Sequence, residues 1–484
     1  MKATLNKVKA RTKVERVARQ DSKLLGPTIN ERLAAGKALR KSVPRASHAK
    51  WVCPANRPDP IGLLKNADRG RLPELLPIRY GRMHHSPFAF FRGAGALMAA
   101  DLARTPKTGM GVQACGDCHV SNFGGFGSPE RQLVFDINDF DETLHAPWEW
   151  DVKRLATSIV LAGRQMAARE RHCSEAVLVA VESYREHMGK YATMRALEVW
   201  YSQLNAEILI EEAETTTAKK YWERAENKAR SQTAEHVFPR ITEVVKGRPR
   251  IIDSPPLVYH PRQMIKLGKR VREMFHRYRL TLPEERRVIL DRYQIVDIAR
   301  KVVGVGSIGT RCAIILLMAS QHDPLFLQFK EALPSALEPY AGKSRYANHG
   351  ERVVTGQRML QAASDIFLGW TRDDEGHDYY FRQLRDMKMT MDLEGMPRED
   401  WIEYIKLCGQ ALARAHARTG DAAQIAGYLG KNDMFDQAMA KFAIDYADQT
   451  ESDFAVFVKA IRTRRLPAGT DIVSPRFRSH LEKG

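Results

Sequence analysis

Apolar positions recur with a helical period along much of the chain, and the clearest helices lie on either side of a strand-rich segment. Residues 150–161 and 174–184 place apolar side chains every three to four positions, as the buried face of a helix requires. Residues 88–101 are apolar and rich in alanine, which favours a buried helix. The helical pattern returns at the end of the chain, most clearly at 401–419.

The pattern between these helical parts is different. Residues 302–317, 324–331 and 379–384 are rich in β-branched, large apolar and aromatic residues, which predicts strands. A helix is predicted at 351–367, between the last two strands, so this region is interpreted as a small sheet that carries one helix. A further short strand is predicted at 132–136, inside a segment whose turn residues interrupt the helical pattern.

Length and composition indicate a folded protein of several structural units. The chain has 484 residues, of which 44% are hydrophobic and 28% charged. It is too long for a minimal disulfide or zinc scaffold and too apolar for general disorder. The six cysteines are scattered, as expected of reduced thiols, and no apolar run has the length of a secretory signal or a membrane span. We therefore expect a cytoplasmic protein.

Most of the formal net charge of +18 belongs to the N-terminal segment. Residues 1–50 contain fourteen Lys and Arg but only three Asp and Glu, so they carry +11. Aromatic residues that stack on bases are absent there before Trp51, which favours a solvated, flexible arm over a dedicated nucleic-acid site. The arm is expected to make at most a weak contact with polyanions.

One turn-rich segment has the residue types that magnesium-dependent phosphoryl transfer requires. Asp117 and Asn122 are five positions apart, and Asp139 follows the short predicted strand. In this chemistry an Asp orients a hydroxyl group and accepts its proton, while an Asn and a second Asp hold the metal ion. Asp and Asn are also ordinary turn formers, and the spacing alone fits both interpretations.

A glycine-rich segment supplies a second candidate. Gly304, Gly306 and Gly309 form a G-x-G-x-x-G pattern that includes Ser307, and Lys330 lies at the end of the next hydrophobic run. A kinase loop over nucleotide phosphates, a Rossmann turn and a flexible hairpin all match the pattern. The kinase interpretation gives Lys330 a role on the phosphates, whereas a lysine at the edge of a strand is the plain alternative.

The first segment resembles a known catalytic loop. Gly116-Asp117-x-His119-x-x-Asn122 is similar to the H-G-D-x-H-x-x-N pattern of aminoglycoside phosphotransferases and their choline- and homoserine-kinase relatives, with Cys115 in place of the first His. Asp139-Phe140-Asp141 and the later Asp151 resemble that family's metal-binding Asp and the structural Asp that follows it. The resemblance implies ATP and Mg²⁺ as cofactors, a catalytic base at Asp117, and metal ligands at Asn122 and Asp139.

The chain as a whole resembles a bacterial family known as domain-of-unknown-function family 2252. The stretches that carry this resemblance are 78–83, 88–93, 116–142, 148–151, 303–310 and 411–417. This family resemblance implies no particular reaction.

The order of the segments differs from that of ordinary kinases, in which the glycine loop and the lysine precede the catalytic loop. Here Gly304 comes 187 residues after Asp117. We therefore predict an α+β, kinase-like bilobal fold that is circularly permuted, with a helical lobe split around a small antiparallel-sheet nucleotide lobe. The helix near the C-terminus resembles the one that precedes the catalytic loop in aminoglycoside kinases. The predicted divisions are a basic flexible arm (1–55), the first part of the helical lobe with the catalytic loop (56–298), the sheet lobe (299–395), and the second part of the helical lobe with the tail (396–484).

Charged partners complete the predicted site. Glu351, at the head of the predicted helix, is expected to pair with Lys330, and Glu331 and Glu338 are the alternatives. Three arginines among apolar residues either clamp a phosphate or an acidic substrate or form internal salt bridges: Arg79, Arg82 and Arg92.

Cys115, Cys118 and His119 also match the C-x-x-C-H motif of c-type haem attachment. That chemistry needs export, which no segment signals. Zinc would need further ligands, and a redox C-x-x-C would need a thioredoxin-like context. Small cysteines that pack around Asp117 are the plainer interpretation.

The sequence therefore favours an ATP- and magnesium-dependent phosphotransferase that acts on a small hydroxylated molecule. Transfer of AMP on the same fold stays open. So does a non-catalytic scaffold that binds nucleotide or nucleic acid, and an NAD-binding Rossmann protein is a third class.

Deletion of residues 1–50 distinguishes two hypotheses: that the protein is a phosphotransferase, and that its function resides in the basic arm. The shortened phosphotransferase is expected to keep its nucleotide binding, because the predicted site lies outside the arm. An arm-driven protein would lose a polyanion affinity that falls steeply with salt concentration. Thermal melts with Mg-ATP, and DNA binding titrated at several salt concentrations, distinguish the two.

Overall fold

The hydrophobic runs of the second half form one antiparallel sheet of six strands. In the computed structural model its order is β12 (Gly369–Arg372), β13 (Asp378–Gln383), β11 (Asp323–Glu331), β10 (Cys312–Ser320), β9 (Gln294–Lys301) and β8 (Val258–Tyr259). Along β10, Ile314 and Leu316 pack with α12 (Ala234–Ile241), whereas Ile315 and Leu317 pack with α13 (Met264–Arg279) on the other face. Because both faces of the sheet are covered, β10 has a continuous apolar sequence instead of an alternating one.

The structure describes residues 26–469, except 212–218, 220–221, 224–225, 228, 230, 232, 262–263, 303, 385–386, 388 and 394. Residues 1–25 of the predicted arm lie outside the described residues. The rest of that arm is not free chain, because α2 (Ile29–Ala38) packs against α18 (Ala422–Leu429) and Arg40 donates hydrogen bonds to the carbonyl oxygens of Gly427 and Tyr428.

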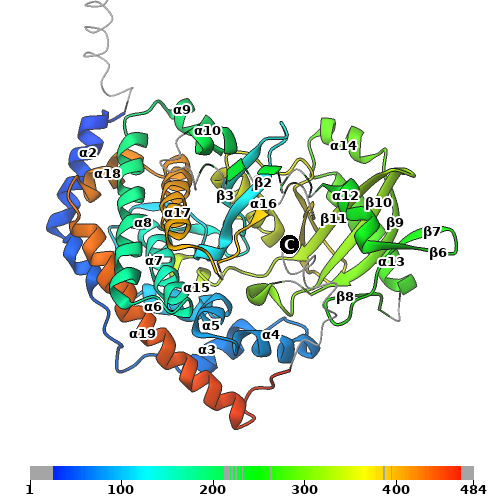
Figure 1. Cartoon of the computed structure of the whole chain (residues 1–484), viewed down its shortest axis with the longest axis horizontal. Helices are drawn as coiled ribbons and strands as arrows, with labels where there is room; N and C mark the ends of the chain where they lie inside the picture. Colours follow the sequence, from blue (N-terminus) through cyan, green and yellow to red (C-terminus); the bar gives the residue numbers. More distant parts are fainter. Residues whose placement is uncertain are drawn as a thin grey trace, which may run out of the picture.

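Four long helices form the largest core, beside the sheet (Figure 1). They are α7 (Trp148–Gln165), α8 (Glu170–Tyr191), α17 (Arg398–Thr419) and α19 (Met434–Arg462). Helix α17 approaches α8 most closely at Gly409, where an added Cβ would collide with the carbonyl oxygen of Ala180. This contact brings the predicted C-terminal helix against a helix that lies more than 200 residues earlier in the chain.

The shorter elements complete the fold. The helices are α3 (Pro60–Ala67), α4 (Leu76–Met83), α5 (Pro87–Gly93), α6 (Gly95–Leu102), α9 (Ala196–Tyr201), α10 (Ala206–Glu211), α14 (Glu284–Leu290), α15 (Glu338–Ala341) and α16 (His349–Leu360). A four-stranded antiparallel sheet has the order β14 (Met389–Thr390), β2 (Phe123–Gly127), β3 (Leu133–Ile137) and β5 (Leu204–Asn205). Two-stranded sheets join β1 (Gly111–Ala114) to β4 (Leu144–Pro147) and β6 (Thr242–Val245) to β7 (Arg248–Ile251).

The protein is therefore a mixed α+β structure with small antiparallel sheets, and several predicted boundaries are wrong in detail. The helix predicted at 88–101 is two helices, α5 and α6, because the backbone of Ala94 leaves the helical region (φ −111°, ψ 32°). The predicted strand at 302–317 becomes regular only at Cys312. The end of the segment predicted as the first part of the helical lobe (56–298) contains β6, β7 and β8 and the start of β9.

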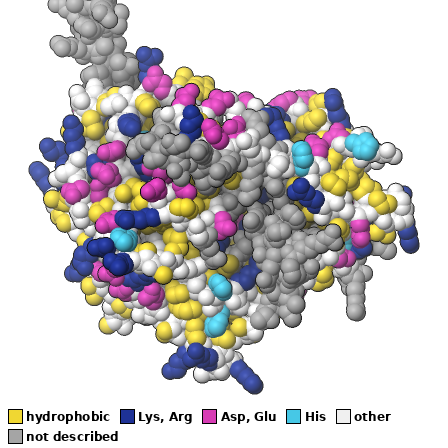
Figure 2. Space-filling view, viewed as in Figure 1, with side chains coloured by type: hydrophobic (Ala, Val, Ile, Leu, Met, Phe, Trp, Pro, Cys, Tyr) yellow, Lys and Arg dark blue, Asp and Glu magenta, His cyan; other side chains and the backbone are white. Residues whose placement is uncertain are grey.

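Charged residues of both signs are dispersed over one face of the molecule. Figure 2 shows Lys and Arg mixed with Asp and Glu across the face in view, without one dominant basic patch. No described helix has the length and apolar character needed to cross a membrane.

The buried pair of Arg414 and Asp136 provides a test of the packing of α17. Arg414 Nη2 lies 2.6 Å and 2.7 Å from the two carboxylate oxygens, and both side chains are at most 1% exposed. Arg414→Ala leaves a buried carboxylate without its counter-charge, so the free energy of unfolding should fall by about 3–5 kcal/mol in urea denaturation. Arg398 lies on the same helix, α17, and forms an exposed pair with Glu175 of α8, so Arg398→Ala should cost less than about 1 kcal/mol. Equal losses would contradict this account.

Candidate functional site

A cavity of about 610 Å³ lies where the six-stranded sheet meets the helices, and most of the predicted site residues line it. They are Asp117, Asn122, Asp139, Gly304, Gly306, Ser307 and Lys330. Gly309 and Glu351 are not in the cavity wall. Segments almost two hundred residues apart in the chain thus meet in one place.

The loop that carries Asp117 is held by a buried carboxylate. Asp151, in the first turn of α7, accepts hydrogen bonds from the backbone N–H groups of Cys115 (2.6 Å) and Gly116 (3.0 Å). His416 Nε2 of α17 lies 3.2 Å from the same carboxylate. Gly116 has a left-handed backbone (φ +83°), and an added Cβ would collide with the carbonyl oxygen of Glu142, so the turn before Asp117 requires glycine.

Asp117 is ionised and already paired. Its Oδ1 accepts a hydrogen bond from Arg154 Nε (2.7 Å) and lies 2.5 Å from Nη2 in an ion pair, and Asn122 Nδ2 donates to its carbonyl oxygen (2.8 Å). Burial raises the pKa of Asp117, but the charges of Arg154 and Arg92 lower it by more, and the net pKa is below the usual value. His119 is neutral, because burial lowers its pKa to about 3. Asp117 therefore has the ionised carboxylate that can orient a hydroxyl group and accept its proton, and its lowered pKa makes it a weak base.

Two neighbouring carboxylates of the loop after β3 have different ionisation. Asp141 accepts hydrogen bonds from Ser307 Oγ (2.9 Å) and Tyr380 OH (2.8 Å) and forms an ion pair with Lys330. Burial raises the pKa of Asp141, but Lys330 and these hydrogen bonds lower it to about 2. Burial and then repulsion by Asp141 raise the pKa of Asp139. The charges of Lys330 and Arg382 lower the pKa of Asp139 by less than burial and Asp141 raise it, and Lys330 forms its ion pair with Asp141.

Lys330 pairs with Asp141, which takes the place of the expected partner Glu351. Glu351 lies in the first turn of α16, where its N–H donates to Asn348 Oδ1 (3.0 Å). The next residue, Arg352, is the one that faces the site. It donates to the carbonyl oxygens of Asp141 (2.8 Å) and Thr143 (2.7 Å). Adjacent residues of a helix point about 100° apart around its axis. The sequence does not show which side of the helix packs against the site, so the charge pattern alone cannot tell whether Glu351 or Arg352 faces it.

The glycine segment forms a tight turn between the antiparallel strands β9 and β10. Val305–Ser307 make a 3-10 turn, and Arg79 donates to the carbonyl oxygens of Val305 (2.6 Å) and Gly306 (3.1 Å). A Cβ on Gly306 would stand 3.8 Å from Asp117 Oδ2, so the turn lies directly against Asp117. A Rossmann turn leads from a strand into a helix. The antiparallel strand that follows here rules that interpretation out.

Gly309 follows this turn and is needed for the conformation of the backbone. Its backbone is left-handed (φ +97°), its carbonyl oxygen accepts from the N–H of Leu72 (2.7 Å), and the position of its absent Cβ lies 2.9 Å from Arg71 Cβ. Glycine is needed there for backbone geometry, outside the cavity.

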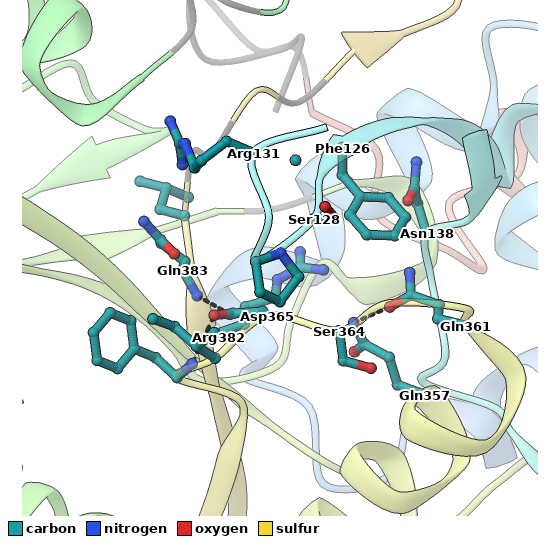
Figure 3. A pocket seen from close by; sticks show the side chains of 15 residues that line it. Phe126, Ser128, Arg131, Asn138, Gln357, Gln361, Ser364, Asp365, Arg382 and Gln383 are labelled. Atoms are coloured by element: carbon teal, nitrogen blue, oxygen red, sulfur yellow. Dashed lines mark hydrogen bonds between the residues drawn. The ribbon is translucent and has the colours of Figure 1, made fainter. Parts of the chain in front are cut away.

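A second cavity of about 190 Å³ adjoins the first and shares Asn138 and Arg382 with it (Figure 3). Amide side chains line it: Gln357 Nε2 donates to Gln361 Oε1 (2.8 Å), and Gln361 Nε2 donates to the carbonyl oxygen of Ile137 (2.7 Å). Arg382 Nε donates to Gln328 Oε1 (3.1 Å) at the boundary between the cavities.

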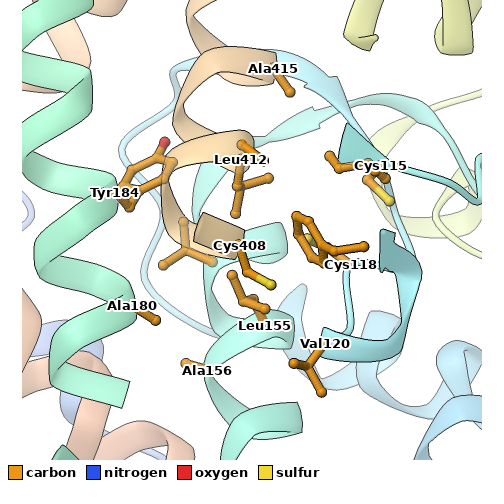
Figure 4. Packing of buried hydrophobic residues seen from close by; sticks show 14 of the residues in the cluster. Cys115, Cys118, Val120, Leu155, Ala156, Ala180, Tyr184, Cys408, Leu412 and Ala415 are labelled. Carbon is orange, nitrogen blue, oxygen red and sulfur yellow. The ribbon is translucent and has the colours of Figure 1, made fainter. Parts of the chain in front are cut away.

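The two cysteines around Asp117 are core residues. Cys115 and Cys118 have no exposed surface and pack with Leu155 of α7 and Cys408 and Leu412 of α17 (Figure 4). Burial raises the pKa of Cys118 to about 11, so its reactive thiolate form is disfavoured. This supports the interpretation of these cysteines as fillers.

Sequence reasoning missed Arg154, Asp141 and Arg352 as site residues. One of them left a signal: Arg154 follows Asp151 by three residues on a predicted helix, so the two share a face. Because Asp151 was already linked to the catalytic loop, its helical neighbour was a candidate for the same loop.

Residues 71–460 match the family described as "Uncharacterized protein conserved in bacteria (DUF2252)", and the chain belongs to this family. No curated protein and no solved structure matches the chain.

The ionisation of Asp141 predicts a pH-dependent contribution to stability. A carboxyl group with a lowered folded-state pKa stabilises the fold above its unfolded pKa and loses this contribution as the pH falls towards the folded value. Asp141→Asn should therefore reduce the free energy of unfolding by about 2 kcal/mol at pH 6, and the difference from the wild type should shrink between pH 4 and pH 2.

Urea denaturation at pH 6, 4 and 3 measures this difference. Asp445→Asn, which removes an exposed carboxylate paired with Lys441, is the matched control and should change little at any of these pH values. A destabilisation by Asp141→Asn that is independent of pH would contradict the lowered pKa.

Proposed function

We propose that the protein is an ATP- and Mg²⁺-dependent phosphotransferase that acts on a small hydroxylated substrate. The observation that carries the proposal is the convergence of Asp117, Asn122 and Asp139 with Lys330 and the glycine turn on one cavity. Motif matches in single segments are weak, but phosphoryl transfer needs these residue types together.

The roles follow from the geometry. Asp117, held by Arg154, orients the acceptor hydroxyl group and takes its proton. The turn from Gly304 to Ser307 covers the phosphates, and Lys330 binds them from β11. The ion pair of Lys330 with Asp141 keeps the ammonium group in the cavity until a nucleotide is bound.

The residues present fit a magnesium ion. Mg²⁺ prefers oxygen ligands, and Asp139 and the side-chain oxygen of Asn122 offer them in the cavity wall. Burial and the neighbouring Asp141 raise the pKa of Asp139, and a bound cation would offset both effects. When bound there, the ion would neutralise charge on the phosphates.

The fold supports the circularly permuted, kinase-like interpretation. The glycine turn joins β9 and β10, and Lys330 lies on the next strand, β11, before helix α16 and strands β12 and β13. In protein kinases the glycine loop likewise precedes the lysine, which lies on a strand of the same sheet. The helical parts, 56–298 and 396–484, would then form one lobe around the sheet lobe at 299–395.

One contact supports the position of the proposed permutation. The N–H of Gln113 in β1 donates to Thr419 Oγ1 (3.2 Å) at the end of α17. A chain that ran directly from α17 into β1 would place the helix immediately before the catalytic loop. That is the order in the aminoglycoside kinases that the loop resembles.

Thermal melts of the full chain test the proposal. Mg-ATP should raise the melting temperature of the wild type by at least about 2 °C, because a ligand that binds only the folded state stabilises it. Lys330→Met and Asp139→Asn should lose this increase, while Lys441→Met, an exposed lysine, should keep it. Asp117→Asn should still bind Mg-ATP but lose transfer of the γ-³²P label.

Labels at two positions distinguish the reactions. Transfer of γ-³²P to small molecules supports the phosphotransferase, whereas transfer of α-³²P indicates AMP transfer. Binding of Mg-ATP that is equal in all four variants, or absent from the wild type, would overturn the proposed function.

A further inference from the structure

One arginine of the cavity makes no side-chain hydrogen bond or ion pair with the described residues. Arg92, in the last turn of α5, lines the cavity, and its buried Nε makes no hydrogen bond to a described residue. Its guanidinium group lies over the ring of Phe88, 5.9 Å from the centroid. Burial lowers the pKa of Arg92, and the charges of Asp117 and Asp139 oppose this effect. A guanidinium that stays protonated without a paired anion has unused donors.

The position of Arg92 is fixed by its neighbours in α5. Arg154 Nη2 donates to the carbonyl oxygen of Phe91 (3.1 Å), and Arg79 Nη2 donates to that of Gly93 (2.6 Å). Arg154 also holds Asp117, so one side chain sets both the reactive carboxylate and the segment that carries Arg92. Arg92 is therefore a placed group and not a mobile surface charge.

A second free arginine stands on the same wall. Arg69, just after α3, is exposed, lines the cavity with Asn66, and has no side-chain partner among the described residues. Gly95 and Ala96, which begin α6, also line this wall. The first amides of a helix add partial positive charge, and no side chain caps α6.

The other cations of the cavity are already engaged. Arg79 bonds to Asp68 and the glycine turn, Lys330 pairs with Asp141, and Arg382 bonds to Gln328. In all, six cations and four carboxylates line the cavity: Arg69, Arg71, Arg79, Arg92, Lys330 and Arg382, with Asp117, Asp139, Asp141 and Glu142. The cations without a side-chain hydrogen bond or ion pair among the described residues thus lie on the α3 to α6 wall, where the carbonyl oxygen of Arg92 borders the glycine turn at Gly306.

We infer that the acceptor substrate carries its own anionic group, a carboxylate or a phosphate, and that Arg92 and Arg69 bind it. This inference rests on the proposed phosphotransferase function and names its substrate class. Guanidinium groups match the planar and tetrahedral oxygens of such anions with paired hydrogen bonds. A hydroxyl group on the same molecule would then face Asp117. The carboxylate of Asp117 is close enough to Arg92 to raise the pKa of its guanidinium group.

Matched small probes test the inference on the full chain. Thermal melts are recorded with a saturating, non-hydrolysable Mg-ATP analogue plus glycerol 3-phosphate, glycerate, inorganic phosphate or glycerol. Glycerol 3-phosphate or glycerate should raise the melting temperature, and glycerol at the same concentration should not. Comparison of glycerol 3-phosphate with glycerate tells which anion the site prefers.

Variants locate the anion. Arg92→Gln should weaken the binding of the preferred probe about tenfold or more, as loss of a charge-assisted hydrogen bond implies, and Arg69→Gln should weaken it less. Both variants should fold normally, because neither side chain has a hydrogen bond or ion pair with a described residue to lose. The melting temperature without ligand checks this. Arg195→Gln, at an exposed arginine of the α9 N-terminus, should bind as the wild type does.

The outcomes separate this inference from the proposed function. Analogue binding without any effect of the anionic probes, or anion binding that is lost in Lys330→Met but kept in Arg92→Gln, would overturn the inference alone. Anion binding that depends on Arg92 in a protein that binds no nucleotide would support the anion site and overturn the phosphotransferase. Stronger binding of glycerol than of its anionic counterparts would also overturn the inference.

Discussion

The buried carboxylate of Asp151 is the interaction on which the cavity depends. It accepts hydrogen bonds from two backbone N–H groups of the turn before Asp117. It also lies 3.2 Å from Nε2 of His416, whose Nδ1 is 2.9 Å from Tyr184 OH. One side chain of α7 therefore connects the loop that carries Asp117 to α17 and α8. A buried charge of this kind is tolerated only when hydrogen bonds satisfy it, so the loop, the helix and the C-terminal segment must adopt their positions together.

Buried arginines join the remaining segments in the same way. Arg79 ties the glycine turn to α5, Arg352 ties α16 to the loop after β3, and Arg154 ties α5 to Asp117. Arg79 and Arg352 donate to backbone carbonyl oxygens of the glycine turn and of the loop after β3, and Arg154 donates to the carbonyl oxygen of Phe91 near the end of α5. A guanidinium group has five donors in a rigid plane, so one arginine can satisfy several such carbonyls at once. Irregular segments can thus be buried near the cavity without unsatisfied polar groups.

The sequence allowed some parts to be predicted closely and left others undetermined. Strands β11 and β13 lie within one residue of their predicted positions, because both are continuous apolar and aromatic runs that turn residues delimit. The cavity residues Asp117 and Lys330 were found because their chemistry is recognisable apart from the fold. The pairing of Lys330 with Asp141 was not, because it joins positions 189 residues apart and depends on the docking of the sheet against the loop. The break at Ala94 was missed since an alanine has no preference for leaving a helix.

The charges that line the cavity balance one another only in part. Lys330 pairs with Asp141, and Arg154 pairs with Asp117. Burial and repulsion by Asp141 raise the pKa of Asp139, although the charges of Lys330 and Arg382 oppose this effect. The buried Nε of Arg92 makes no hydrogen bond to a described residue, and burial lowers the pKa of Arg92 against the charges of Asp117 and Asp139. Under the proposed function, a metal ion at Asp139 and an anion at Arg92 would each offset part of the cost of burying these charges.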